Sequence, residues 1–104
     1  MPYAVATTPP VLDYLADRAE VSDEALKRLI ATYEYDLSVN AEHLWKTSPL
    51  DPGSLCFQCE YPIPDVDTQH LFRIVVSMES AAGGIVRVVF AEHEVIGRIN
   101  PPPA

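Results

Sequence analysis

The sequence predicts an α+β protein in which two or three N-terminal helices pack on one face of a three-stranded antiparallel meander. Three observations favour this fold. Apolar residues recur at helical spacing before about residue 46, they alternate with a period of two after residue 55, and a stretch rich in proline and glycine separates the two patterns. With 104 residues and 48% hydrophobic content, the chain has the size and composition of a single domain.

The first expected helix follows a proline pair near the start of the chain. Thr8 is a residue type that caps helices, and Pro9 suits the first helical position. The helix should extend as far as Glu20, and its apolar side comprises Val11, Leu12, Leu15 and Ala19. The helical part of the domain therefore begins at about residue 8 and extends to about residue 46.

The second expected helix covers residues 23–37 and has stronger signals at its start. Ser22 is a favourable N-cap, and two acidic residues follow it in the first turn. The apolar stripe of this helix comprises Leu26, Leu29, Ile30, Tyr33 and Leu37. A brief third helical turn after Asn40 would carry Leu44 and Trp45.

The sheet part is expected between about residues 55 and 99. Strands are predicted over residues 55–61, about 70–79 and 85–91, with a hairpin loop between the last two. Pairing Glu79 with Ile85 places apolar residues opposite one another on the core face, which comprises Phe72, Ile74, Val76, Met78, Val86, Val88 and Phe90. Residues 94–99 are a candidate fourth strand, and residues 100–104 form a proline-rich tail.

The opposite face of this predicted sheet is neither clearly apolar nor clearly polar. Two helices cannot cover both faces, so part of this surface should stay exposed. The candidate interface consists of Arg73, Val75, Ile85, Arg87 and Val89. Apolar residues rimmed by arginines suit contact with a protein partner or with a second copy of the chain.

Charge limits the classes of partner. The chain has 15 acidic against 7 basic residues, a formal net charge of −8, and no basic stripe. Such a surface repels phosphate, so nucleic-acid binding is not expected. No apolar run reaches the length of about 18 residues that spans a membrane, and the start of the chain lacks a secretory pattern. We therefore expect no membrane association and a cytoplasmic location.

The two cysteines stand in a C-x-x-C spacing that redox and zinc sites also use. On an extended strand, however, Cys56 and Cys59 would lie about 10 Å apart on opposite faces, beyond the reach of about 7 Å of a disulfide. We expect Cys59 in the core and Cys56 outside. Zinc is the alternative, with two of His43, His70 and His93 as further ligands, but these histidines are widely spaced. No metal or cofactor is expected.

Two other clusters contain residue types used in catalysis. Asp65, Asp67 and His70 lie in one loop region, where aspartate is also an ordinary turn former. His93 stands between Glu92 and Glu94, but neighbours on a strand point to opposite sides. No phosphate-binding glycine loop or nucleophile motif is present in the sequence, so no catalytic residue is assigned.

The sequence favours a small acidic, cytosolic protein-interaction module without catalytic activity, of the inhibitor, immunity, chaperone or adaptor type. The alternative is a small-molecule binding domain or modest enzyme. Its pocket would lie between the helices and the sheet, lined by Tyr33, Trp45 and the loop from Pro62 to His70.

Overall fold

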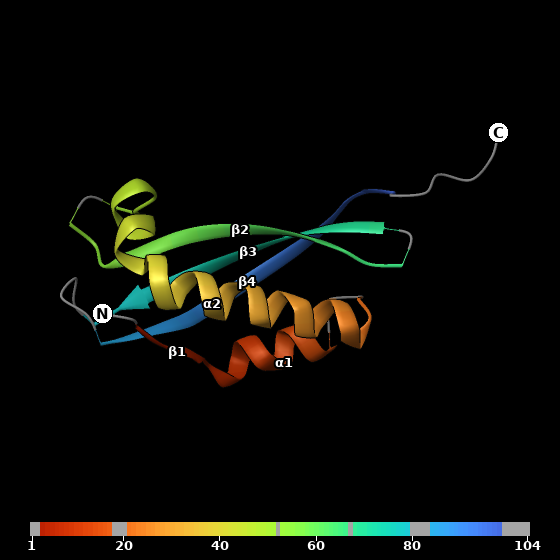
Figure 1. Ribbon diagram of the computed structural model, residues 1–104, viewed down its shortest axis with the longest axis horizontal. Coiled ribbons are helices and arrows are strands. Elements are labelled where there is room, and N and C mark those ends of the chain that lie inside the picture. The colour runs from red at the N-terminus through yellow and green to blue at the C-terminus, as the bar shows by residue number, and fades with distance from the viewer. Residues whose placement is uncertain (1–2, 18–20, 52, 67, 80–83, 99–104) are drawn as a thin grey trace.

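The computed structural model describes residues 3–17, 21–51, 53–66, 68–79 and 84–98, and it confirms an α+β fold (Figure 1). The elements in chain order are β1 (Ala4–Thr7), α1 (Pro9–Asp17), α2 (Asp23–Thr47), β2 (Cys56–Pro64), β3 (Thr68–Met78) and β4 (Ile85–Arg98). Neither α1 nor α2 has the length and apolar character that crossing a membrane requires. The predicted helix end at Ala19 and Glu20, most of the predicted hairpin loop and the proline-rich tail lie outside the described residues.

The sheet has four strands in the order β1-β4-β3-β2 and is mixed, which corrects the prediction of a purely antiparallel meander. Strands β2, β3 and β4 are antiparallel neighbours, whereas β1 pairs with residues 85–88 of β4 in parallel. The sequence did not predict β1 because four residues are too few to establish an alternating pattern. The candidate fourth strand at residues 94–99 is instead, as far as Arg98, the continuation of β4.

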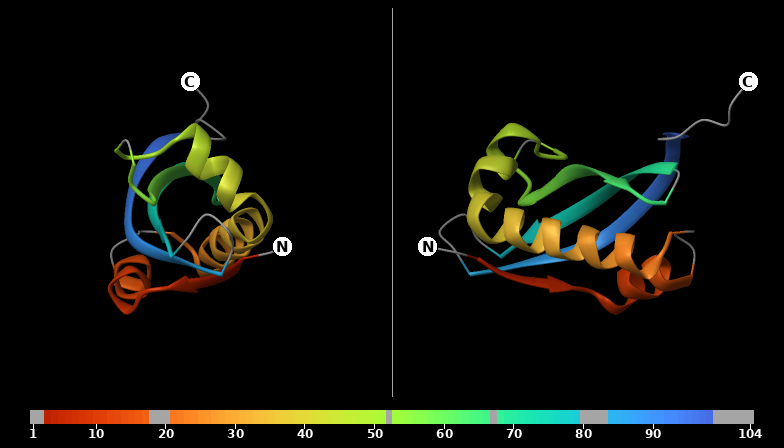
Figure 2. Two further views of the ribbon diagram at one scale, coloured as in Figure 1. Left: turned by 90° about the vertical axis from the view of Figure 1, so that its left-hand side faces the viewer. Right: turned by 45° about the vertical axis from the view of Figure 1, so that its right-hand side comes forward.

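Helix α2 is one continuous helix, so the separate third turn predicted after Asn40 is wrong. Ser22 caps its start as expected, since its hydroxyl accepts a hydrogen bond from the Ala25 amide at 3.2 Å. Its buried stripe has a residue at every fourth position: Ala25, Leu29, Tyr33, Leu37 and Ala41. Steps of four drift around a helix of 3.6 residues per turn. The stripe therefore winds around α2, and the sheet curves around the helix (Figure 2).

Helix α1 occupies a different place from α2, although the sequence predicted both on one face. It follows β1 and packs beside β4, while α2 alone fills the hollow of the sheet (Figures 1 and 2). Val11 and Leu15 are buried, as predicted, but Leu12 is exposed. The Thr8 hydroxyl donates to the Val88 carbonyl at 3.0 Å. Thr8 thus fixes the start of α1 to β4.

The predicted register of the β3–β4 hairpin is confirmed as far as Val88. Met78 pairs with Val86, and Val76 pairs with Val88. At the next step, Val75 pairs with Phe90, so Val89 is an extra residue in β4 and forms a β-bulge. We refer to this irregularity as the Val89 bulge.

The bulge reverses the faces of β4 from Phe90 to Val95, where a second irregularity at Ile96 restores the original alternation. The reversal makes one core assignment wrong. Phe90, predicted to lie in the core, is 53% exposed, and Ala91 takes its place opposite Ile74. Regular alternation would have pointed Glu92 and Glu94 inward together with Phe90. Burying unpaired carboxylates costs far more than exposing one aromatic ring. The bulge avoids that cost.

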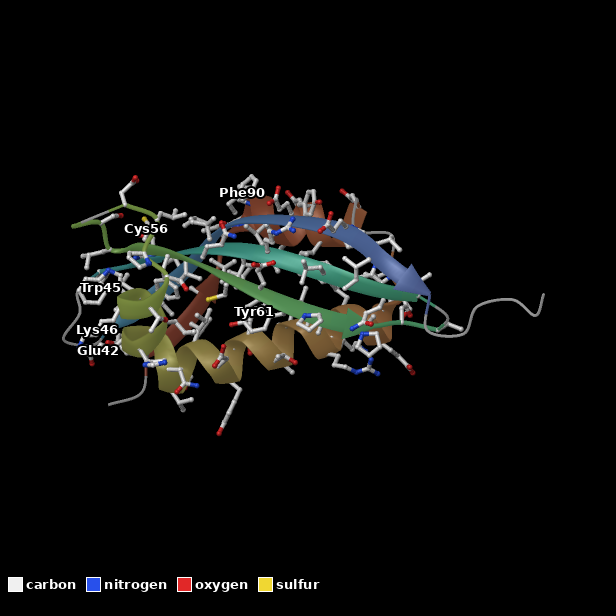
Figure 3. The ribbon with its side chains drawn as sticks, turned by 90° about the horizontal axis from the view of Figure 1, so that it is seen from above. Glu42, Trp45, Lys46, Cys56, Tyr61 and Phe90 are labelled. Carbon is white, nitrogen blue, oxygen red and sulfur yellow. The ribbon has the colours of Figure 1, made fainter. Side chains whose placement is uncertain are left out.

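Hydrogen bonds connect α2 to the sheet in the core. The buried Tyr33 hydroxyl pairs with that of Thr7 on β1, and the Tyr61 hydroxyl of β2 donates to the Asp36 carboxylate at 2.7 Å. Figure 3 shows Tyr61 between β2 and α2. Burial raises the pKa values of Tyr33 and Tyr61, and it raises the pKa of Cys59 to about 11.

These raised pKa values predict alkaline unfolding. The unfolded chain releases the three protons near their ordinary pKa values, whereas the folded chain retains them. The free energy of unfolding should therefore fall above about pH 9–10, by about 1.4 kcal/mol per pH unit for each group. Urea unfolding between neutral pH and about pH 11 measures this slope. Tyr61→Phe should make it shallower, and a free energy that stays constant up to about pH 11 would contradict the prediction.

Candidate functional site

The side of the sheet away from α2, here called the outer face, is not covered by a helix in the described part of β2 and β3 (Figure 2). The strand register defines its residues. They are Cys56, Gln58 and Glu60 from β2, Leu71, Arg73, Val75 and Ser77 from β3, and Arg87, Phe90, Glu92 and Glu94 from β4.

Four of the five predicted interface residues gather around the outer face. Arg73 and Val75 lie on the central strand β3 and are half-buried, and Arg87 lies on β4 opposite Ser77. Val89 is 41% exposed at the bulge. Ile85 stands at the start of β4, and the pair of Arg87 and Ser77 separates it from Val75.

Glutamates engage both arginines of this face. Arg73 lies 2.8 Å from Glu94, 3.3 Å from Glu60 and 3.8 Å from Glu92. Arg87 lies 3.1 Å from Glu79. Two cations therefore stand against four carboxylates. The outer face presents a net negative charge to a partner, although the sequence suggested an arginine rim.

Phe90 is the residue of this face that the sequence analysis missed. It stands beside Val75 in a row that crosses the sheet to Gln58, and Figure 3 shows it on the side of β4 away from α2. A signal for it was present in the sequence. Glu92 and Glu94 follow Phe90 in steps of two, so all three would lie on one face of a regular strand. Continuing the predicted core face through them would therefore have placed two carboxylates in the core.

The cysteines occupy the faces that the sequence predicted. Cys59 is buried opposite Ile74, Cys56 lies on the outer face opposite Ser77, and both are free thiols. Because burial raises the pKa of Cys59 to about 11, its sulfur stays protonated at neutral pH. The C-x-x-C spacing thus reflects strand packing here.

The structure brings two of the predicted histidines together. His70 is 2% exposed, and its Nδ1 lies 2.6 Å from Nε2 of His93. The ring centroids are 4.8 Å apart and the planes differ by 19°, and the hydrogen bond joins the two rings directly. Nε2 of His70 lies 2.8 Å from the Thr68 hydroxyl. Both ring nitrogens of His70 are therefore occupied by protein partners.

The remaining candidate residues do not form one cluster. Asp65 accepts hydrogen bonds from the Ser22 amide at 2.9 Å and the Ser22 hydroxyl at 2.7 Å, and these bonds lower its pKa. Asp67 lies outside the described residues. Among the residues that are described, no group of three or more His, Cys, Asp or Glu side chains is arranged to hold a metal ion. Glu92 and Glu94 face outward, away from His93.

The residues of the alternative pocket pack against their neighbours. Tyr33 is fully buried, and the Trp45 indole donates to the Ser54 carbonyl at 2.6 Å. A surface hollow of about 310 Å³ is lined by residues 64–66 of the predicted loop and by the start of α2. Neither Tyr33 nor Trp45 contributes to its wall, nor to the walls of two hollows beside α1. No protein-family model, curated protein or solved structure matches this chain. The case for a function therefore rests on the outer face.

Proposed function

We propose that this protein is a small acidic protein-interaction module without catalytic activity, of the inhibitor, immunity, chaperone or adaptor type. In this proposal the outer face around Val75, Val89 and Phe90 binds a protein partner. A cytoplasmic location is part of the proposal, because both cysteines are free thiols, as is usual in a reducing compartment.

The observation that carries the proposal is the exposure of Phe90. Leaving about half of a phenylalanine side chain in water forgoes about 1 kcal/mol of hydrophobic free energy. Aromatic side chains of this kind are common anchors in protein interfaces, where a polar rim surrounds them. The glutamates that hold Arg73 form such a rim beside Phe90.

Binding to a different protein is favoured over pairing of two outer faces. Two copies placed face to face would bring the same excess of carboxylates together, and like charges across an interface oppose association. A partner with basic residues around an apolar centre would match the face.

Charged substitutions at Val75 and Val89 should abolish association without unfolding the protein. Val75→Asp and Val89→Asp place further negative charge in the proposed contact, and Val39→Asp is the matched control because Val39 is an exposed valine on α2. The measurement is quantitative capture from native lysate on the immobilised chain, with sedimentation to detect self-association.

We expect the unmodified chain and Val39→Asp to retain the same set of proteins. The retained amount of these proteins should fall at least about tenfold with Val75→Asp and with Val89→Asp. Circular dichroism should be unchanged in all variants. Retention of the same proteins by all four chains would overturn the proposal, as would the absence of any retained protein or self-association.

A further inference from the structure

We infer that a groove between α1 and β4 receives an apolar side chain from a basic, amphipathic polypeptide segment of the partner. This inference rests on the proposed function and specifies the chemistry of the partner. The groove has a volume of about 180 Å³ and is lined by Pro10, Val11, Tyr14, Val89, Phe90 and Ala91.

The Val89 bulge forms one wall of this groove. The extra residue turns Val89 and Phe90 toward α1 and solvent, whereas regular pairing would have placed Phe90 against Ile74 in the core. Bulges often re-aim side chains at functional sites. Helix α1 forms the other wall, and its position is fixed by the hydrogen bond from Thr8 to Val88.

The size of the groove fits a side chain better than a free small molecule. Small-molecule pockets usually have volumes of roughly 300–1,000 Å³ and enclose most of the ligand. This groove is smaller, open and mostly apolar in its lining residues. One leucine, isoleucine or phenylalanine of a partner, packed between Tyr14 and Phe90, would suit it.

Two aspartates lie beside the groove on the α1 side, and they define the rest of the partner. A second hollow shares Pro10 and Tyr14 with the groove and is completed by Asp13 and Asp17. These aspartates stand four positions apart on α1, where like charges repel, and Asp17 lies at the helix end that disfavours anions. Lysine or arginine residues next to the partner's apolar side chain would reduce the repulsion between the two aspartates. They would also offset the unfavourable position of Asp17 at the helix end.

The test uses the full chain and a short amphipathic peptide of alternating leucine and lysine pairs, with fluorescence anisotropy to measure affinity. The comparison peptides replace lysine by glutamate or leucine by serine. The Leu–Lys peptide should bind at least about tenfold more tightly than either comparison peptide at low salt. Amide chemical shifts should change at Tyr14 and Phe90.

Variants of the protein separate the groove from general attraction to an acidic chain. Phe90→Ser should weaken binding about 30-fold, whereas Tyr35→Ser, at an aromatic residue that is 71% exposed on α2, should leave it unchanged. Asp13→Asn combined with Asp17→Asn should weaken binding about fivefold, and about 0.5 M salt should remove that difference. Glu34→Gln combined with Asp51→Asn is the charge control.

Absence of peptide binding would overturn the inference, as would equal effects of Phe90→Ser and Tyr35→Ser or of the two charge-removing pairs. The proposed function has a separate outcome. If captured proteins still depend on Val75 and Val89 while the peptides show no preference for the groove, the interaction module stands and only the assignment of a basic amphipathic partner fails.

Discussion

Ala91→Asp is expected to destabilise the protein by about 3 kcal/mol or more, whereas Phe90→Asp should change the free energy of unfolding by about 1 kcal/mol at most. Ala91 is buried opposite Ile74, so an aspartate there would place a carboxylate against the core. Phe90 is half-exposed on the outer face. Urea unfolding at neutral pH measures both changes.

The order of the two effects is the informative result. Without the bulge, Phe90 would face Ile74 and Ala91 would face solvent, and Phe90→Asp would then be the more damaging substitution. Ala91→Ser is a milder variant that keeps the measurement within range if Ala91→Asp does not fold. Greater destabilisation by Phe90→Asp than by Ala91→Asp would exclude the bulged register.

His70→Ala should cost about 2–4 kcal/mol of stability. The substitution removes a fully buried ring, leaves a cavity and takes away the hydrogen-bond partner of His93 Nε2 and of the Thr68 hydroxyl. His93→Ala should cost less, because His93 is only partly buried. Urea unfolding of both single variants and of the double variant forms a complete mutant cycle.

The cycle should give a coupling free energy of about 1–2 kcal/mol between the two histidines, as expected for side chains in direct hydrogen-bond contact. A control cycle between His70 and the distant exposed residue Val39 should give a value near zero. Additive effects of His70→Ala and His93→Ala would show that the two rings do not interact in solution.

Much of the fold could be predicted from the periods in the sequence. The burial of Leu29, Tyr33 and Leu37 on α2, the alternation in β2 and the apolar pairs of the hairpin all reflect burial of one face, and burial fixes such patterns directly. The predicted stripe also included Leu26 and Ile30, which are only partly buried, and it omitted Ala25 and Ala41. The inward position of Cys59 and the capping role of Ser22 follow from the same local rules. These features need no knowledge of distant contacts.

The features that the sequence analysis missed depend on contacts between distant segments. Strand β1 is too short to have a recognisable period, and it forms because β4 offers a free edge beside it. The Val89 bulge depends on the residues that follow it, because a regular strand would bury the carboxylates of Glu92 and Glu94. The predicted strand ends at about Ala91, before that conflict arises. As a result, neither the exposure of Phe90 nor the contact of His93 with His70 was predicted.

The reversal of faces at the Val89 bulge exposes Phe90 and brings the two histidines together. Nuclear Overhauser contacts between side chains of the isotopically labelled protein test it most directly. The bulged register predicts contacts of the Ala91 methyl with Ile74, of the His93 ring with Phe72, and of the Phe90 ring with Val75. Contacts of the Phe90 ring with Ile74, together with Glu92 beside Phe72, would contradict it.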